Sequence, residues 1–348
     1  MAQPFNPARL ELTGEAVPIA QNVESFQNQF FGMFSVSQEG TLVYRSTGGA
    51  ALVPTWFDTD GTPTQKVGEP ADYASPTLSP DESRIAVSRT TSSGADIVIL
   101  DARTGAATQF TFDPAPDTHP LWSPDGRFIV FRSMRGGRER IFVKPVDGSS
   151  EERVLTEQGG VPTSWSQDGR YLVLSPRETA GDVWVLSNPT AASGPLTPVQ
   201  VLDTGAVRGQ AELSPDGQWL AYMAPESVSS NALQVFVKPF RPGVADASGA
   251  KWLVSAGRLA ALPRWRADGK QLYFVSLNTF DLMVGDIDTA SGFRASPPRR
   301  LFAAPAPLLP VNWQISHDGK RFLFITTPDG GRPSPFRVVV NWASALPQ

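Results

Sequence analysis

A polar turn followed by a short apolar run recurs along the chain. In Leu121–Ser133, LWSPDGRFIVFRS, the turn SPDG separates Trp122 from the run FIVF. Strand alternation places Phe128 and Val130 on one face and Ile129 and Phe131 on the other, so both faces are apolar. This pattern predicts a β-strand that is buried on both sides. Related segments lie at 35–46, 77–89, 164–176, 212–224, 264–276 and 314–326, which makes seven copies with the quoted one.

The segment 117–156 predicts four strands separated by turns rich in Gly and Ser. The predicted strands are His119–Ser123, Arg127–Ser133, Arg140–Val146 and Glu152–Leu155. The first turn has a clear physical basis, because Pro124 sets φ for a type I turn and Gly126 accepts a positive φ. Ser123 or Asp125 is expected to hydrogen-bond nearby backbone N–H groups.

The spacing of the copies predicts the fold class. The acidic residues of the motif are Glu39, Asp81, Asp125, Asp168, Asp216, Asp268 and Asp318. Their separations are 42, 44, 43, 48, 52 and 50 residues, and a period of roughly 40–50 residues with four strands each is typical of a propeller blade. We therefore predict an all-β protein, a seven-bladed β-propeller of four-stranded blades, with six or eight blades as alternatives. Each copy would be the innermost hairpin of its blade.

The ends of the chain suggest how the ring closes. The last copy is followed by only one more strand-like run, 336–342, while Leu10–Ala20 precedes the first blade without a partner. Since an open ring would expose unpaired backbone, we expect Leu10–Ala20 to pair with 336–342. We predict a single domain over 1–348, with 1–32 as the ring-closing segment. The blades would begin near 33, 74, 117, 160, 208, 260 and 310.

An apolar residue stands three positions before every motif acid. These residues are Val36, Leu78, Trp122, Trp165, Leu213, Trp265 and Ile315. A blade that is apolar on both faces must stack on two neighbours. We therefore expect this set to pack between blades, with the three tryptophans buried.

Composition narrows the possible partners. The net charge is −4 and the pI about 5.4, so no global field attracts nucleic acid or anionic membrane. The sequence has no cysteine, which excludes disulfides, thiolate nucleophiles and Cys-ligated zinc. No apolar run reaches the roughly 18–20 residues of a membrane span. We expect a monomer without cofactors, and a periplasmic or other extracytoplasmic location whose signal lies outside this chain.

Several phrases resemble a known family. They are ARLELTGEAVPIA, VGEPADYASPTLSPD, FTFDPAPDTHPLWSPDGRFIVFRS, VFVKPF and PRWRADGKQLYFVS, and the resemblance covers nearly the whole chain. The chain is similar to TolB-type propellers, a WD-repeat-like group that also occurs as the non-catalytic domain of prolyl-oligopeptidase-like enzymes. It is closer still to propeller regions that follow serine/threonine kinase domains in acidobacteria-like bacteria. The resemblance implies sensing or protein contact and carries over no catalytic residues, although TolB itself has fewer than seven blades.

This sequence departs from the usual motif at five positions: Gln38, Glu82, Gln167, Ala267 and His317. Glu82 replaces the glycine of the turn, and His317 replaces its proline. The sequence attaches no function to these changes. We expect His317 to be an exposed turn residue.

Polar residues at equivalent positions of the inner strands suggest a binding site at the mouth of the channel. The candidates are Asp117, His119, Arg208, Gln210, Glu212, Arg264 and Asn312. His119 with Asp113 and Asp117 has the chemistry of a base or of a hard-cation ligand, or of a purely structural loop. Glu212 and Arg264 lie on adjacent blades, where they would form a salt bridge or anchor a ligand carboxylate. We expect the ligand on the face of the variable inter-blade loops, opposite the tight turns.

Three functions fit these observations. The first, which we favour, is a non-catalytic module that binds a protein, peptide or glycan, such as the sensor region of a bacterial signalling protein. The second is a propeller lyase or hydrolase with a site in the channel. The third is the gating propeller of a prolyl-oligopeptidase-like peptidase without its hydrolase domain, since the sequence has no Gly-x-Ser-x-Gly elbow.

Overall fold

A computed structural model describes the chain except for residues 1, 21–24, 27–30, 33, 38, 46–50, 176–180, 192–193, 208–209, 227–229, 231, 244–248, 306–312, 329–335 and 343–348. The chain divides into two compact units. Unit 1 comprises 1–51 and 332–348, and unit 2 comprises 52–331. Each unit is described by itself below.

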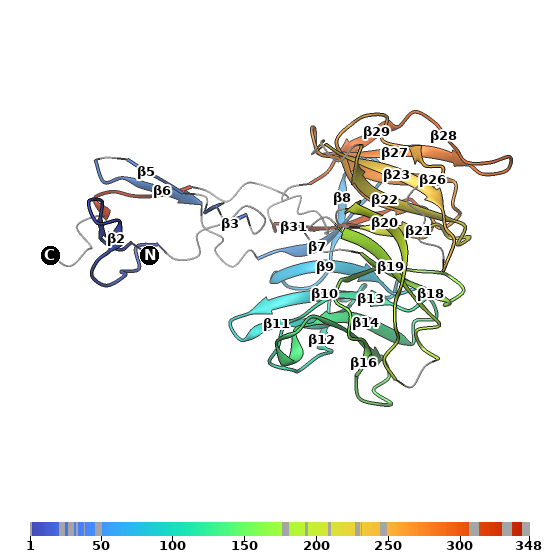
Figure 1. Ribbon diagram of the computed structural model, residues 1–348, viewed down its shortest axis with the longest axis horizontal. Helices are drawn as coiled ribbons and strands as arrows, with labels where there is room; N and C mark the ends of the chain where they lie inside the picture. Colours follow the sequence, from blue (N-terminus) through green and yellow to red (C-terminus); the bar gives the residue numbers. More distant parts are fainter. Residues whose placement is uncertain are drawn as a thin grey trace. The chain divides into compact units, whose positions relative to one another are not determined.

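Unit 2 consists of antiparallel sheets that follow one another in sequence order (Figure 1). Blade 1 is β9 (Asp72–Leu78), β10 (Arg84–Thr91), β11 (Gly94–Asp101) and β12 (Ala107–Gln109). Blade 2 is β13 (Asp117–Trp122), β14 (Phe128–Ser133), β15 (Arg140–Pro145) and β16 (Arg153–Thr156), with a short 3₁₀ turn at Arg135–Gly137. Blade 3 is β17 (Val161–Trp165), β18 (Tyr171–Ser175), β19 (Gly181–Ser187) and β20 (Val199–Val207).

The remaining blades have the same plan. Blade 4 is β21 (Ala211–Leu213), β22 (Trp219–Pro225), β23 (Leu233–Pro239) and β24 (Trp252–Leu253). Blade 5 is β25 (Ala260–Trp265), β26 (Gln271–Ser276) and β27 (Asp281–Asp288), with both β28 (Arg294–Ala295) and β29 (Arg299–Ala303) pairing with β27. Blade 6 combines β30 (Trp313–Ile315) and β31 (Phe322–Thr326) with β7 (Val53–Phe57) and β8 (Pro63–Lys66) from the other end of the unit.

The predicted turn chemistry is present in the repeats. In blade 2, the Ser123 hydroxyl donates to Asp125 Oδ1 (2.6 Å) and accepts from the Phe128 N–H (2.9 Å), while Gly126 has φ +70°. In blade 1, hydrogen bonds from Ser79 and Ser83 lower the pKa of Asp81 to about 2. The carboxylate therefore stays ionised and closes the turn, which explains why the acid recurs in each copy.

Each inner hairpin leads into a strand that is buried on both faces, as the apolar runs predicted. Ile129, Val130 and Phe131 of β14 are all 0% exposed. Neighbouring blades share apolar clusters. One cluster joins Ile97 of blade 1 with Trp122 and Phe131 of blade 2, and another joins Phe302 of blade 5 with Phe57 and Phe324 of blade 6. The hydrophobic core of unit 2 therefore lies between the blades.

The ring of unit 2 closes through β7, which lies beside β31 in Figure 1. The two strands are antiparallel, with Phe322 opposite Phe57 and Thr326 opposite Val53. The buried hydroxyl groups of Thr55 and Thr326 hydrogen-bond at 2.9 Å. Closure by a strand from the N-terminal side was expected, but the expected segment was wrong. The apolar, fully buried run 53–57 supplies the strand in place of Leu10–Ala20.

The described residues of unit 1 form three small sheets. β1 (Phe5–Asn6) pairs with β2 (Glu11–Leu12), and β3 (Ser25–Phe26) pairs with β4 (Phe31–Gly32). In the third sheet, β6 (Leu42–Arg45) lies between β5 (Phe34–Val36) and β32 (Phe336–Val339). The 336–342 run therefore pairs with the first repeat copy, and the predicted pairing with Leu10–Ala20 is wrong because Glu11 and Leu12 are already paired with β1.

The division into two units differs from the predicted single domain. Six copies of the repeat form the six blades of unit 2, whereas the first copy forms the three-stranded sheet of unit 1. The all-β propeller architecture is confirmed, but the count of seven four-stranded blades is not. The strands begin within a few residues of the expected blade starts, for example at Asp72, Asp117, Val161 and Ala260. Within the described residues, no helix has the length and apolar character needed to span a membrane.

Candidate functional site: the central cavity of unit 2

A cavity of about 440 Å³ lies where the six inner strands of unit 2 meet. Every blade contributes to its wall. The residues four positions before the motif acids all line it: Thr77, Leu121, Ser164, Glu212, Arg264 and Gln314. Residues of the tight turns, such as Pro80, Pro124 and Pro215, line it as well. The repeat therefore builds the cavity, since each of the six copies in unit 2 contributes the same two positions to its wall.

Glu212 and Arg264 are the charged pair of the cavity wall, as the sequence suggested. Arg264 Nη1 lies 3.3 Å from Glu212 Oε2, and their side chains are only 10% and 16% exposed. The backbone N–H of Trp265 also donates to Glu212 Oε1, at 3.4 Å. Burial raises the pKa of Glu212 to about 7, although Arg264 and the Trp265 N–H oppose this change. Glu212 therefore titrates near neutral pH in the folded protein.

Two neutral polar groups of the wall join neighbouring blades. Ser164 Oγ accepts from the Leu213 N–H (3.0 Å), which links blade 3 to blade 4. Gln314 Nε2 donates to the Pro76 carbonyl (2.9 Å), which links blade 6 to blade 1. These contacts hold the inner strands in a fixed arrangement, so the cavity is built on rigid elements.

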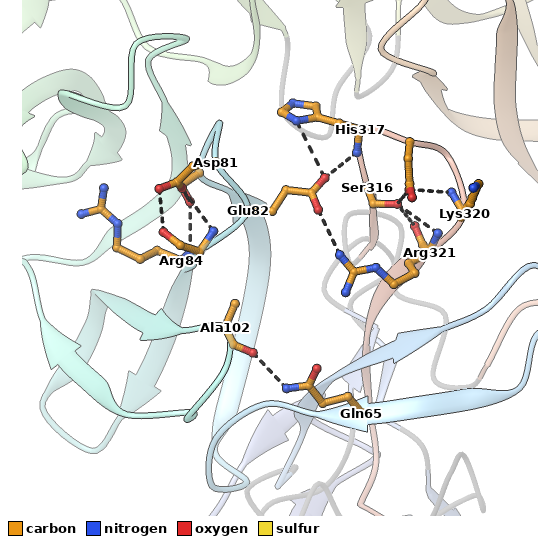
Figure 2. Close-up of polar contacts among 12 residues, drawn as sticks. Gln65, Asp81, Glu82, Arg84, Ala102, Ser316, His317, Lys320 and Arg321 are labelled. Carbon is orange, nitrogen blue, oxygen red and sulfur yellow. Dashed lines mark hydrogen bonds and ion pairs between the residues drawn. The ribbon is translucent and has the colours of Figure 1, made fainter.

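Glu82 and His317 lie at the edge of the cavity and join the first and last blades of the ring. Figure 2 shows the Glu82 carboxylate between His317 and Arg321. Arg321 Nη2 lies 3.1 Å from Glu82 Oε2, and the His317 backbone N–H donates to Glu82 Oε1. His317 Nδ1 lies 3.8 Å from the same oxygen. The sequence showed both residues as departures from the motif but gave them no role. The replacement of the turn glycine by the charged Glu82 was the one sequence feature that could have indicated this contact.

Asp117 belongs to a different site. Its carboxylate is fully buried and pairs with Arg135 (2.8 Å), which also contacts Glu152 (2.7 Å) and Asp113 (3.4 Å). Burial raises the pKa of Asp117, against the effect of hydrogen bonds from Ser133 and Arg135. Asp117 therefore anchors a charge network within blade 2 and does not line the central cavity.

The other predicted site residues lie away from the cavity or outside the described residues. His119 is half-buried, has φ +55°, and its backbone N–H donates to Ser88 Oγ (3.1 Å). Gln210 is buried, and neither residue lines the cavity. Arg208 and Asn312 lie outside the described residues. Two of the seven candidates, Glu212 and Arg264, are thus brought together at the axis.

The tryptophans of the repeat have two environments. Trp122 and Trp265 are 4% and 5% exposed, as expected for residues that pack between blades. Trp165 is partly exposed, donates from Nε1 to the Gly169 carbonyl (3.1 Å), and lines the cavity with the other two. The expected burial is confirmed for two of the three. In the described part of the chain, His, Asp and Glu side chains nowhere gather in threes that could hold a metal ion.

Six repeated four- or five-stranded sheets around a central cavity define unit 2 as a β-propeller. The family description "TolB beta propeller domain" matches residues 60–234, half of the chain. The chain therefore belongs to the TolB β-propeller domain family.

Individual relatives agree with this assignment. The Tol-Pal system protein TolB of Wolinella succinogenes is 25% identical over 154 residues, 44% of this chain and 37% of that protein. A structure of TolB from Acinetobacter baumannii superposes with a TM-score of 0.52 at 15% identity, over 76% of this chain and 67% of the other. Oligogalacturonate lyase in complex with manganese gives a TM-score of 0.51 at 14% identity, over 90% and 82% of the two chains. Both structural likenesses concern the fold alone.

The matched segments cover 8%, 22% and 37% of the first curated relatives' own lengths. These relatives are thus matched over well under half of their length.

Proposed function

We propose that this protein is a non-catalytic binding module whose central cavity receives a segment of a protein or peptide ligand. One observation carries the proposal. The cavity is walled by every blade of the ring, and its charged side chains are already paired: Glu212 with Arg264, and Glu82 with Arg321. Such a wall offers shape, neutral hydrogen-bonding groups and indole surface to a ligand, which are the usual means of recognition.

Within this proposal, Arg264 and Glu212 set the polarity of the ligand. A ligand carboxylate would compete with Glu212 for the guanidinium group of Arg264, and a ligand N–H group would bind the Glu212 carboxylate. A role as the sensor region of a bacterial signalling protein and an extracytoplasmic location form part of the same proposal. The proposal also includes the face of the ring from which the ligand enters. Because tight-turn residues line the cavity, they favour entry from the tight-turn face, opposite to the face expected from loop variation.

A displayed peptide library tests the proposal. Selection against the wild-type protein should yield peptides whose affinity falls at least about tenfold in Leu121→Trp, which fills the cavity, and severalfold in Arg264→Ala. Thr108→Trp is the matched control, because Thr108 is exposed on the outer strand β12 of blade 1. Peptides that bind Leu121→Trp as well as wild type, or that are lost in the control, would contradict the cavity as the binding site.

A second candidate function is a propeller enzyme with its site in the same cavity. The specific observation in its favour is Glu212, whose pKa of about 7 suits a group that exchanges protons at neutral pH. Turnover in a panel of uronate glycans and peptides, lost in Glu212→Gln with the fold intact, would favour the enzyme over the binding module.

A further inference from the structure

The contact between blades 6 and 1 depends on an unusual residue. Glu82 follows the motif acid Asp81, a position that holds glycine in the other copies, and it adopts the left-handed backbone conformation with φ +57°. This conformation costs a non-glycine residue roughly 1 kcal/mol or more. In return, the Glu82 carboxylate reaches the preceding blade and pairs with Arg321 (3.1 Å). At this contact, the chain supplies both the arginine and the carboxylate.

The same packing recurs at other contacts between blades. A side chain at Gly126 would begin 3.5 Å from Pro80 of the preceding blade. At Gly169 the corresponding distance to Pro124 is 3.9 Å, and at Gly269 the distance to Pro215 is 3.8 Å. At these three contacts, the residue after the motif acid thus faces the turn of the blade before it. Gly126 therefore has the same position relative to blade 1 that Glu82 has relative to blade 6.

Between blades 1 and 2, the arginine is present but the carboxylate is not. Arg84 and Arg321 occupy the same place in the repeat, three residues after the motif acids Asp81 and Asp318. Arg84 lies over the Trp122 ring, 4.7 Å from its centroid, and no ion pair involves it within the described residues. Gly126 brings no side chain to this contact. A cavity of about 260 Å³ is found here, lined by Arg84 and Gly126 together with Arg127, Asp147 and Ser149.

The charges of this second cavity suit an anion. Two guanidinium groups, Arg84 and Arg127, face one carboxylate, Asp147, which already accepts the Ser149 N–H at 2.9 Å. Among the lining residues, which include Phe128 and Pro145, the balance is one positive charge. The Asp81 carboxylate lies outside the lining but also interacts electrostatically with Arg84. An arginine held over an indole ring is pre-organised to bind a carboxylate through two N–H groups.

We propose that the cavity between blades 1 and 2 binds a carboxylate group from outside the chain, and that Arg84 plays the part that Arg321 plays for Glu82. The carboxylate can belong to a free dicarboxylic acid or to an acidic side chain of a peptide. None of the residues that line this site lines the central cavity. The proposal is therefore independent of the function assigned to the central cavity.

The test follows the side-chain Nε–Hε NMR signal of Arg84, assigned through Arg84→Lys, during titration with glutarate and with tetraglutamate. Wild type should show a saturable shift with at least one of the two. Gly126→Glu supplies an internal carboxylate, in the conformation that Glu82 already adopts, and should weaken binding at least about tenfold. Arg84→Gln, followed by calorimetry, should do the same without changing the turn.

Gly169→Glu is the matched control. Gly169 has φ +75° and faces Pro124 of blade 2, as Gly126 faces Pro80 of blade 1. In blade 2, however, the position that corresponds to Arg84 is Phe128, so a glutamate at 169 would find no arginine there. This variant should bind like wild type. Tighter binding of tetraglutamate than of glutarate would identify a peptide as the source of the carboxylate, and equal binding a free acid. The proposal is overturned if wild type binds neither compound, or if Gly126→Glu and Arg84→Gln bind as wild type does, or if Gly169→Glu loses binding equally.

Discussion

Two sheets of this protein are assembled in the same way but end with different cores. Blade 6 joins a copy of the repeat, β30–β31, to strands from the other end of the chain, and the sheet of unit 1 joins the copy β5–β6 to β32. In blade 6, Phe322 and Phe324 are 0% and 3% exposed. In unit 1, Phe34 and Phe336 are 59% and 64% exposed, and among the residues described there only Leu42 and Tyr44 are buried.

The difference shows that the repeat specifies a hairpin but not its burial. Phe322 is enclosed because blade 5 supplies Tyr273 and Phe302, whose rings lie 5.5 and 5.4 Å away. In unit 1, the apolar side chains of β5 and β32 stay exposed, among them Phe34, Val36, Phe336 and Val338. A sheet with two apolar faces gains its full stability only between two neighbours.

The largest expected effect on stability comes from comparing alanine substitutions of one phenylalanine in each sheet. Phe322→Ala should lower the free energy of unfolding by about 3–5 kcal/mol, because it leaves a cavity among close-packed rings. Phe336→Ala should cost less than about 1 kcal/mol, because its side chain is already exposed to water. Urea unfolding followed by circular dichroism measures both. Similar losses for the two variants would show that the sheet of unit 1 is as well packed as blade 6.

The next effect concerns pH and belongs to unit 2. The pKa of Glu212 rises from its ordinary value of 4.5 to about 7 on folding, so the native state binds the proton more tightly than the unfolded state. The associated stability is fully present below pH 4.5 and is lost as the pH rises to about 7. The expected loss is up to roughly 3 kcal/mol.

Glu212→Gln should remove this part of the pH dependence, because glutamine does not titrate. Unfolding curves at pH 5 and pH 8 should therefore differ less for the variant than for the wild type. If the two proteins lose the same stability over this interval, Glu212 is ionised throughout and is held by Arg264.

The smallest effect concerns the contact that Glu82 makes across the closure of the ring. Glu82→Ala should cost about 1–2 kcal/mol, since it removes a partly exposed ion pair and an acceptor for the His317 N–H. Glu157→Ala is a suitable control, because Glu157 is 56% exposed and lies 3.7 Å from Arg140. The control should change stability by less than about 0.5 kcal/mol. If Glu82→Ala and Glu157→Ala change stability equally, the Glu82 contact contributes no more than an ordinary surface ion pair.

Much of the fold could be predicted from local pattern. The period, the SPDG turn and the apolar runs predicted the strands of blade 2 to within two or three residues at each end. They also identified Glu212 and Arg264 as neighbours on the channel wall. These features follow from interactions within one repeat or between equivalent positions of adjacent repeats. The closing strand was assigned to Leu10–Ala20 instead of 53–57, because sequence pattern alone does not rank the possible pairings of distant strand-like segments.

The sequence by itself determined that this chain forms a propeller of repeated blades, because alternation, turn residues and period act over short distances along the chain. Only the tertiary structure decided which copies share a ring, which strand closes it, and which charges meet. Asp117 was expected at the channel mouth but is buried beside Arg135, and Glu82 crosses to a residue 239 positions away. Such pairings depend on packing between blades, where burial and the need to satisfy each buried charge select one arrangement from many that the pattern allows.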